Sequence, residues 1–251
     1  MEDSNTVKNK TNRIAMLIDG DNAQPSLIKY MLAETGKYGL VTIRRIYGDW
    51  TTSNMSGWKE ALQTYAFQPI QQFRYTVGKN ATDSAMIIDT MDILYEGVVN
   101  SFCLVSSDSD YTRLATRIRE KGFFVMGLGK KMTPRSFVNA CEVFVFAENL
   151  MPVPREKTKR STSKKTTPPD VSTKEAVPLL LNAYDLAVQD DDWAFLGTIG
   201  NHMRQLDPSF DARTYGHRQL STLIRAFPDI FQVREIRKKD GTSIISVKLK
   251  D

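Results

Sequence analysis

Short apolar runs alternate with longer amphipathic stretches from Arg13 to about residue 150. This alternation is typical of β-α units, in which the strands of a mostly parallel sheet are joined by helices on both of its faces. The sequence therefore predicts an α/β fold with a doubly wound sheet in the strand order 3-2-1-4-5. The expected strands are residues 14–18, 41–48, 69–77, 102–106 and 123–129, the expected helices are residues 24–35, 57–67, 83–96, 111–121 and 133–140, and residues 142–150 are a candidate edge strand.

The composition changes after residue 150. The next 25 residues are rich in proline, serine, threonine and basic residues, which is typical of a flexible linker. Beyond them, helical stretches at 176–188, 193–206 and 215–227 precede two alternating runs around Asp240-Gly241, a dipeptide favoured in tight hairpins. This order indicates a winged helix. The expected domains are a polar tail (1–12), an α/β domain (13–150), a basic flexible linker (151–175) and a small C-terminal winged-helix domain (176–251).

The cysteines and histidines limit the chemistry. Cys103 and Cys141 lie in apolar runs without C-x-x-C spacing, which indicates reduced thiols and argues against a zinc site. His202 and His217 both follow the linker, far from every aspartate pair, so the sequence does not favour a Ser/His/Asp or Cys/His catalytic site. No apolar run approaches the roughly 18 residues of a membrane span. We therefore expect a soluble, cytoplasmic protein whose chemistry rests on carboxylates.

The positive charge is concentrated in the linker. The chain has a formal net charge of +5 and a sequence pI near 9.1. Residues 152–175 contain seven Lys or Arg and three acidic residues, which gives +4 of that total. The two folded parts are therefore nearly neutral, and the overall charge alone is weak evidence for nucleic-acid binding.

Aspartates follow the first and fourth expected strands. Asp19 closes the first strand and Asp108 closes the fourth, and these strands are neighbours in the order 3-2-1-4-5. Asp83 begins the helix after the third strand, and Asp110 lies just beyond Asp108. Several ionised carboxylates in a small volume need a positive ion among them, and oxygen ligands favour Mg²⁺ or Mn²⁺. A water molecule on such an ion could attack phosphorus.

Taken one at a time, these four aspartates are also ordinary turn or helix N-terminal residues. Their joint occurrence at two neighbouring strand ends favours a site. Asp21 could be a ligand, a turn former or neither. Asp89 and Asp92, one turn apart in the expected helix, are expected mostly on a solvated face.

Three separated motifs resemble the NYN family of PIN-like nucleases. They are IDGDN at 18–22, KNATD at 79–83 followed by Asp89, and VSSDSDY at 105–111. The resemblance covers about residues 13–150 and implies a metal-dependent ribonuclease that uses Mg²⁺ or Mn²⁺. The metal-holding carboxylates it implies are Asp19, Asp83, Asp108 and Asp110, and Asn22 and Ser106 would orient ligands or waters beside them.

Residues 176–251 resemble the OST-HTH, or LOTUS, domain. The matching features are residues 193–196, the run PSFDARTYG at 208–216, residues 220–227 and the closing hairpin. Such domains are associated with RNA binding, and some bind protein partners instead. The resemblance therefore implies an RNA partner, with a protein partner of this domain as the alternative. Candidate contacts are Arg213, His217, Arg218 and Arg225 on the third helix and Arg234, Arg237, Lys238 and Lys239 around the wing.

Two other functions fit part of the sequence. Haloacid dehalogenase-type phosphatases also carry a strand that ends in D-x-D, but they need Thr or Val where Ala23 stands, and they leave Asp83 unexplained. The stronger alternative is a non-catalytic RNA-binding module that keeps an acidic pocket.

RNA contacts are expected from basic and aromatic side chains. Arg44 and Arg45 point to opposite faces of their strand, so at most one of them faces the crevice. Tyr47, Trp50 and Tyr75 are available for stacking with bases. The RNA-binding candidates are Lys79, Arg44, Lys130, Arg135, Arg218 and Lys238.

Overall fold

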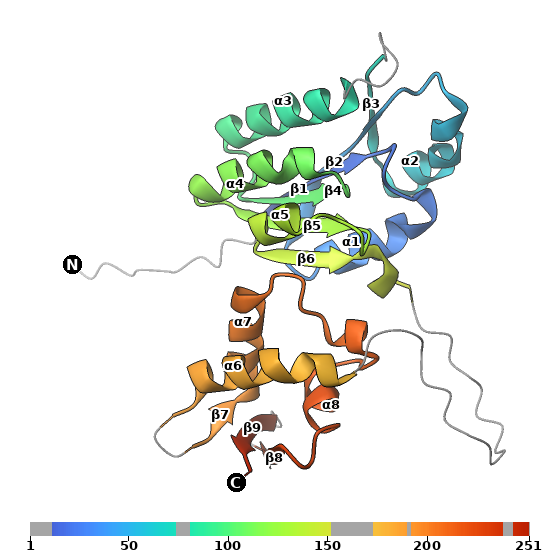
Figure 1. Cartoon of the computed structure of the whole chain (residues 1–251). Helices are drawn as coiled ribbons and strands as arrows, with labels where there is room; N and C mark the ends of the chain where they lie inside the picture. The colour runs from blue at the N-terminus through green and yellow to red at the C-terminus, as the bar shows by residue number, and fades with distance from the viewer. Residues whose placement is uncertain (1–11, 74–80, 152–172, 190–191, 238–242, 251) are drawn as a thin grey trace, which may run out of the picture. The chain divides into compact units, whose positions relative to one another are not determined.

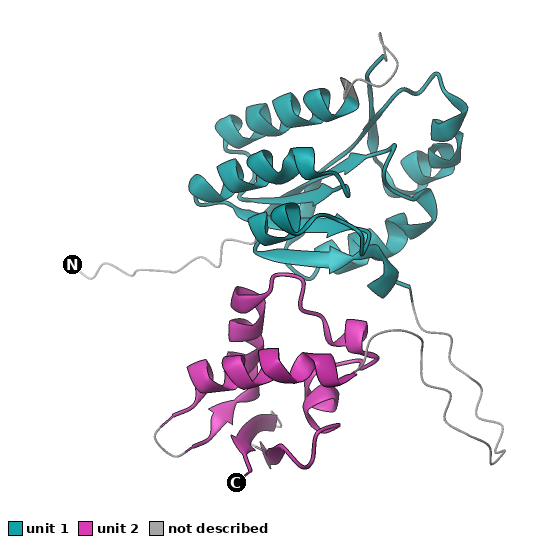
Figure 2. Ribbon diagram, viewed as in Figure 1, with its two compact units in different colours: residues 1–151 teal, residues 152–251 magenta. Residues whose placement is uncertain are grey.

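A computed structural model of the chain describes residues 12–73, 81–151, 173–189, 192–237 and 243–250 (Figure 1). The chain divides into two units, residues 1–151 and residues 152–251 (Figure 2). The predicted tail (1–12), except Asn12, lies outside the described residues, as do the predicted linker from 152 to 172 and the candidate residues Lys79 and Lys238.

A parallel sheet forms the centre of the first unit. Within the described residues its order is β3-β2-β1-β4-β5-β6, so the predicted order is confirmed and a sixth strand extends one edge. Every pair of neighbouring strands is parallel. The expected third strand is cut short at residue 71, and residues 74–80 lie outside the described part. The strands are β1 (Arg13–Asp19), β2 (Leu40–Gly48), β3 (Gln68–Gln71), β4 (Ser101–Val105), β5 (Phe124–Gly129) and β6 (Val143–Phe146).

Helices cover both faces of this sheet, as the sequence predicts (Figure 1). Side chains alternate between the faces of β1: Met16 joins the core that includes Met31 of α1, and Leu17 joins the core that includes Met86 of α3. A strand buried on both faces reads as one continuous apolar run, which explains IAMLI at 14–18. The helices are α1 (Ile28–Thr35), α2 (Lys59–Tyr65), α3 (Ala81–Glu96), α4 (Thr112–Glu120) and α5 (Arg135–Ala140).

The second unit has helices and an antiparallel sheet. Its described strands lie in the order β7-β9-β8. The core between helices and sheet includes Leu180, Ile199, Leu223 and Val247. The elements are a 3-10 turn (Thr173–Ala176), α6 (Val177–Ala187), β7 (Ala194–Phe195), α7 (Leu196–Leu206), a second 3-10 turn (Ala212–Tyr215), α8 (Leu220–Ile224), β8 (Phe231–Arg237) and β9 (Ser243–Leu249).

The second unit differs from expectation in three places. The third helix, expected over 215–227, is a short helix at 220–224 after a separate 3-10 turn. Gly216 ends that turn with φ of 78°, a left-handed conformation that breaks the helical run. Strand β7 was not predicted, because two residues are too few to show an alternating pattern. Residues 173–175, expected in the linker, form a 3-10 turn that leads into the buried Ala176.

Two further expectations concern the whole chain. In the ranges the structure describes, no helix combines the length and apolar character needed to cross a membrane. Cys103 and Cys141 are buried free thiols, and burial raises the pKa of Cys103 to about 12.

Candidate active site

The site begins where β1 and β4 end side by side. Ile18 pairs with Val105 in the parallel ladder, so the next residues, Asp19 and Ser106, meet at the same edge of the sheet. The Ser106 hydroxyl donates a hydrogen bond of 3.0 Å to Oδ2 of Asp19. Both residues are buried. A side-chain hydrogen bond therefore connects the ends of the two strands that the sequence predicts to be neighbours.

Asp19 is fully buried and organises the loop that follows β1. Its Oδ2 accepts the Asn22 side-chain amide at 2.6 Å, and its Oδ1 accepts the backbone N–H of Asp21 at 3.1 Å. Burial raises the pKa of Asp19, while these bonds and the one from Ser106 act in the opposite direction. A phosphatase nucleophile must be reached by substrate, so the burial of Asp19 also argues against the dehalogenase-type alternative.

Three other aspartates bring their carboxylates together. Asp83 comes from the first turn of α3, and Asp108 and Asp110 come from the loop after β4. One carboxylate oxygen from each lies within 4.8 Å of the others, which makes them a potential metal-holding group among the described residues. Asp19 is outside this group. We call Asp83, Asp108 and Asp110 the acidic cluster.

Local hydrogen bonds shape the loop that carries two of these aspartates. Oδ1 of Asp108 accepts the backbone N–H of Asp110 at 2.9 Å, which caps the 3-10 turn at residues 109–111. The backbone N–H of Asp108 donates to the Ser106 hydroxyl at 3.2 Å. Ser106 therefore links the buried Asp19 to the acidic cluster through its single hydroxyl.

The electrostatics of Asp83 reflect crowding of like charges. Burial raises the pKa of Asp83, and the negative charges of Asp19, Asp108 and Asp110 raise it further. The buried hydroxyl of Tyr111 donates a hydrogen bond of 2.7 Å to Oδ1 of Asp83, which opposes that shift. The same surroundings, burial first, raise the pKa of Tyr111. Such crowding favours a bound cation, and the oxygen-only donors suit Mg²⁺ or Mn²⁺.

Asp21 and Thr82 connect the β1 loop to the start of α3. The Thr82 hydroxyl donates to Oδ2 of Asp21 at 3.2 Å. This bond helps to fix the first turn of α3, in which Asp83 follows directly. The sequence did not point to Thr82, or to the hydroxyl of Tyr111 as a partner of Asp83, because both bonds join segments distant along the chain.

The prediction that Asp89 lies on a solvated face is wrong. Its carboxylate pairs with the Arg45 guanidinium and accepts the Tyr47 hydroxyl, which tethers α3 to β2. Tyr47 is fully buried, so it cannot stack on a base. On the opposite face of β2, Arg44 donates to the Tyr65 carbonyl at 2.8 Å. Both arginines therefore hold the sheet to its helices.

The remaining candidates in the first unit have different surroundings. Lys130 lines a small pocket with Asn22, Gln24 and Ser106, and its backbone N–H donates to the Ser107 hydroxyl at 2.9 Å. Arg135 is exposed at the start of α5. Trp50 is half-buried and donates its ring N–H to the Ile70 carbonyl, whereas Tyr75 lies outside the described residues.

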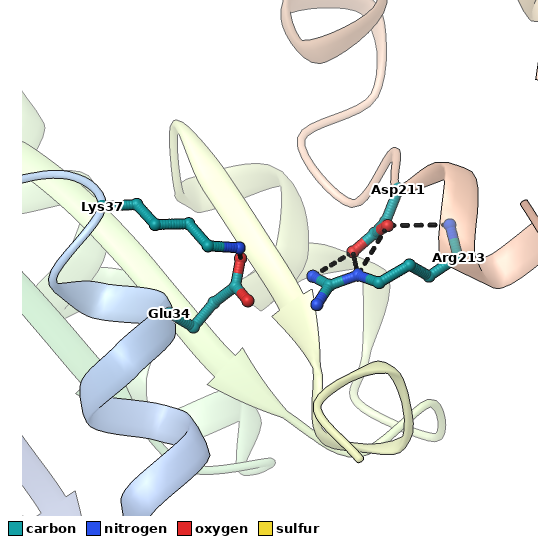
Figure 3. Close-up of polar contacts among 4 residues, drawn as sticks. All are labelled: Glu34, Lys37, Asp211 and Arg213. Atoms are coloured by element: carbon teal, nitrogen blue, oxygen red, sulfur yellow. Dashed lines mark hydrogen bonds and ion pairs between the residues drawn. The ribbon is translucent and has the colours of Figure 1, made fainter. Parts of the chain in front are cut away.

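Several arginines of the second unit are engaged by partners. Arg213 binds the Asp211 carboxylate through its guanidinium at 2.5 to 3.0 Å and through its backbone N–H at 2.9 Å (Figure 3). This is the kind of short-range ion pair also seen in the first unit between Glu34 and Lys37, 2.7 Å apart (Figure 3). Arg225 pairs with Glu235 at 3.2 Å. Arg218 and His217 lie between the 3-10 turn and α8, and Arg218 is exposed.

Comparison with known domains matches both parts of the chain. Residues 13–149 match the NYN domain, and residues 169–242 match the OST-HTH/LOTUS domain. No curated protein matches the chain.

Two solved structures are similar to parts of it. The crystal structure of a protein of unknown function from Vibrio parahaemolyticus is 18% identical, covers 54% of this chain and 93% of its own, and has a TM-score of 0.46. The solution structure of an uncharacterized protein from Nitrosomonas europaea is 28% identical, covers 40% of this chain and 90% of its own, and has a TM-score of 0.27.

Proposed function

The chain belongs to the NYN family, and on that premise we propose that it is a metal-dependent ribonuclease. The reaction is hydrolysis of RNA phosphodiester bonds at the acidic cluster, with Mg²⁺ or Mn²⁺ as the cofactor. The observation that carries this proposal is the approach of carboxylate oxygens from Asp83, Asp108 and Asp110 to within 4.8 Å of one another. Polyanionic RNA would not approach these aspartates unless a cation neutralised their negative charge.

The residues divide the work as follows. Asp83, Asp108 and Asp110 would hold the ion. Asp19 would add a fourth negative charge next to them, with its carboxylate fixed by hydrogen bonds from Asn22 and Ser106. When bound, the ion would stabilise negative charge on the phosphate oxygens and lower the pKa of the attacking water. Tyr111 holds Asp83 in place through Oδ1.

RNA capture is assigned to both units. We assign phosphate contacts to Lys130, which lines a pocket with Asn22 and Ser106, and to the exposed Arg135. The OST-HTH/LOTUS domain is of a type associated with RNA binding, and we assign it the capture of RNA rather than of a protein partner. The proposed compartment is the cytoplasm, which suits the two free, buried thiols.

The decisive experiment compares two variants with the same loss of charge. Asp108→Asn removes a ligand but keeps a side-chain oxygen to accept the Asp110 N–H, so the loop is preserved. Asp92→Asn removes a carboxylate from an exposed position of α3, nine residues beyond Asp83, and is the control. Substitution of Asp19 by asparagine is a less suitable test. The Asp19 carboxylate accepts hydrogen bonds from several donors, and the NH₂ group of an asparagine could not accept them.

The measurement is cleavage of end-labelled mixed RNAs in Mg²⁺, in Mn²⁺ and in EDTA. We expect cleavage by the wild type in metal only, a loss of more than about 100-fold in Asp108→Asn, and wild-type rates in Asp92→Asn. RNA binding without cleavage in either metal would instead support the non-catalytic alternative. Cleavage that persists in EDTA would contradict the metal site.

A further inference from the structure

One face of the sheet in the second unit is left uncovered by its helices. Ala194, Val233 and Val247 point into the helical core. Side chains alternate along a strand, so their neighbours point the other way. The register pairs Phe195 and Arg234 with Ser246, which places them on the same face. Gln232 and Ser246 also lie on this face. We call its aromatic, apolar and basic residues the sheet platform: Trp193, Phe195, Arg234, Ile236, Ile244 and Lys248.

The platform is built from flat and apolar groups. The Arg234 guanidinium stacks over the Trp193 ring at 4.2 Å from its centroid. Ser246, beneath them in the middle strand, is only 2% exposed, whereas Phe195 and Ile236 are 44% and 46% exposed. None of the six platform residues belongs to the core of this unit as the structure describes it. The exposed surface of Phe195 and Ile236 is therefore available to a ligand.

The charge on the platform is positive. Arg234 and Lys248 lie on it, and Glu235, the single acidic residue in the described parts of the three strands, alternates to the other face and pairs with Arg225. Lys248 contacts Asp192 at 2.8 Å at the edge of the sheet. Lys248, Arg213 and Arg225 are therefore each paired with a carboxylate. Arg234 stacks on a ring, which leaves guanidinium N–H groups able to reach a phosphate.

We propose that the sheet platform binds single-stranded RNA. Unpaired bases stack on the Phe195 ring and on the guanidinium plane of Arg234, which Trp193 supports from below, and the backbone phosphates contact the Arg234 guanidinium. Stacking on aromatic rings and arginine planes beside cationic groups is the chemistry that recognises unpaired bases. The described strand positions of this face carry no carboxylate, and the Asp192 carboxylate at its edge is paired with Lys248, so the face complements RNA better than it complements an apolar peptide. This inference rests on the proposed function, in which RNA is the substrate.

With the sheet platform as the binding surface, the main RNA contact lies on the sheet and not on the third helix, where the sequence predicts several contacts. Helix α8 has only five residues, and Arg225 at its C-terminal end is paired with Glu235. An extended sheet face accommodates several successive bases, as single-strand binding requires. The substrate class that this geometry favours is therefore unpaired RNA rather than a duplex.

The test measures the affinity of the full-length protein for a fluorescein-labelled, unstructured 12-nucleotide RNA of mixed sequence by anisotropy. EDTA is present throughout, so the result does not depend on cleavage and stays separate from the test of the ribonuclease. Phe195→Ala and Arg234→Ala should each weaken binding about 5- to 100-fold. Phe195→Leu, which keeps an apolar side chain, should also weaken binding, which separates stacking from a folding defect. Arg234→Lys should lose affinity while the salt dependence stays close to that of the wild type.

Matched controls come from exposed helical positions of the same unit. Leu186→Ala removes an exposed apolar side chain from α6, and Arg204→Ala removes an exposed cation from α7. Both should bind RNA within twofold of the wild type. The proposal is overturned if the Phe195 and Arg234 variants bind as the wild type does. It is equally overturned if Arg218→Ala weakens binding while the platform variants do not, because the contact then belongs to the third helix.

Discussion

The charged side chains of the acidic cluster in the first unit and the arginines of the second unit have opposite surroundings. In the first unit, Asp83, Asp108 and Asp110 crowd together, and the pKa of Asp83 is raised because burial and neighbouring carboxylates disfavour its charged form. In the second unit, Arg213 and Arg225 each lie against a carboxylate. Pairs of opposite charges within the chain stabilise the fold. Crowded charges of the same sign instead favour the binding of an ion of the opposite sign. A charged side chain at a conspicuous sequence position can serve either purpose, and only its partners distinguish them.

The largest expected effect is metal stabilisation confined to the first unit. A ligand at one hundred times its dissociation constant stabilises a folded domain by about 2.7 kcal/mol. Mn²⁺ should therefore raise the melting temperature of the first unit and leave that of the second unchanged. The effect should vanish in Asp108→Asn and persist in Asp92→Asn. Calorimetry with and without Mn²⁺ measures both transitions, and an equal shift in the two units would contradict a single metal site in the acidic cluster.

The second prediction contrasts a paired aspartate with a crowded one. Asp89→Asn removes the charge that faces Arg45, whose Nε is already buried without a hydrogen-bond partner among the described residues. Charged hydrogen bonds contribute about 1.5–3 kcal/mol each, so we expect a loss of roughly 2 kcal/mol of unfolding free energy. Asp108→Asn in the absence of metal should instead hold or gain stability, because it relieves repulsion. Denaturant unfolding in EDTA compares the two, and the same sign for both would break the contrast.

The third prediction concerns pH. The folded pKa values of Asp19 and Asp83 lie above the ordinary value of 3.8, so between that value and the raised ones the folded state binds more protons than the unfolded state. Stability of the metal-free protein should therefore fall as pH rises through this window, by at most about 1.4 kcal/mol per pH unit for each group. Metal-dependent cleavage should have the opposite pH dependence. Its rate should fall as pH drops, because Asp83 takes up a proton.

Thermal unfolding in EDTA between pH 4 and pH 8 measures the first trend, and cleavage rates at fixed Mg²⁺ measure the second. Asp108→Asn is the informative variant, since it removes one of the charges that raise the pKa of Asp83 and should flatten the stability profile. A metal-free protein that gains stability with rising pH in this range would contradict the crowding.

The smallest expected effect is that of Tyr111→Phe. The change deletes the hydroxyl that donates to Oδ1 of Asp83 and keeps the buried ring. A single hydrogen bond is worth about 1 kcal/mol, so stability should fall by no more than that. Mn²⁺ affinity measured by calorimetric titration should fall about tenfold, as for loss of an outer-shell partner. RNA binding in EDTA should be unchanged, and unaltered Mn²⁺ affinity would show that Tyr111 only fills space.

The sequence predicted what depends on local pattern. Strand order followed from alternating apolar runs, and the aspartates after the first and fourth strands drew attention because those strand ends meet at one edge of the sheet. The tether of Asp89 to Arg45 and Tyr47 was missed because helical spacing alone gives no sign of a partner forty residues away. Strand β7 was missed because two residues are too few to show an alternating pattern. The division of the third helix was missed because composition does not reveal the left-handed conformation of Gly216.

The wide spacing of the acidic cluster along the chain has a consequence for biosynthesis. Its members come from α3 and from the loop after β4, and β4 pairs with β1, the strand at the start of the domain. A nascent chain that ends before residue 110 lacks a ligand. Under the proposed function, the growing polypeptide is therefore inert toward the messenger RNA that encodes it. It acquires its activity only after the fourth strand has left the ribosome and joined the first.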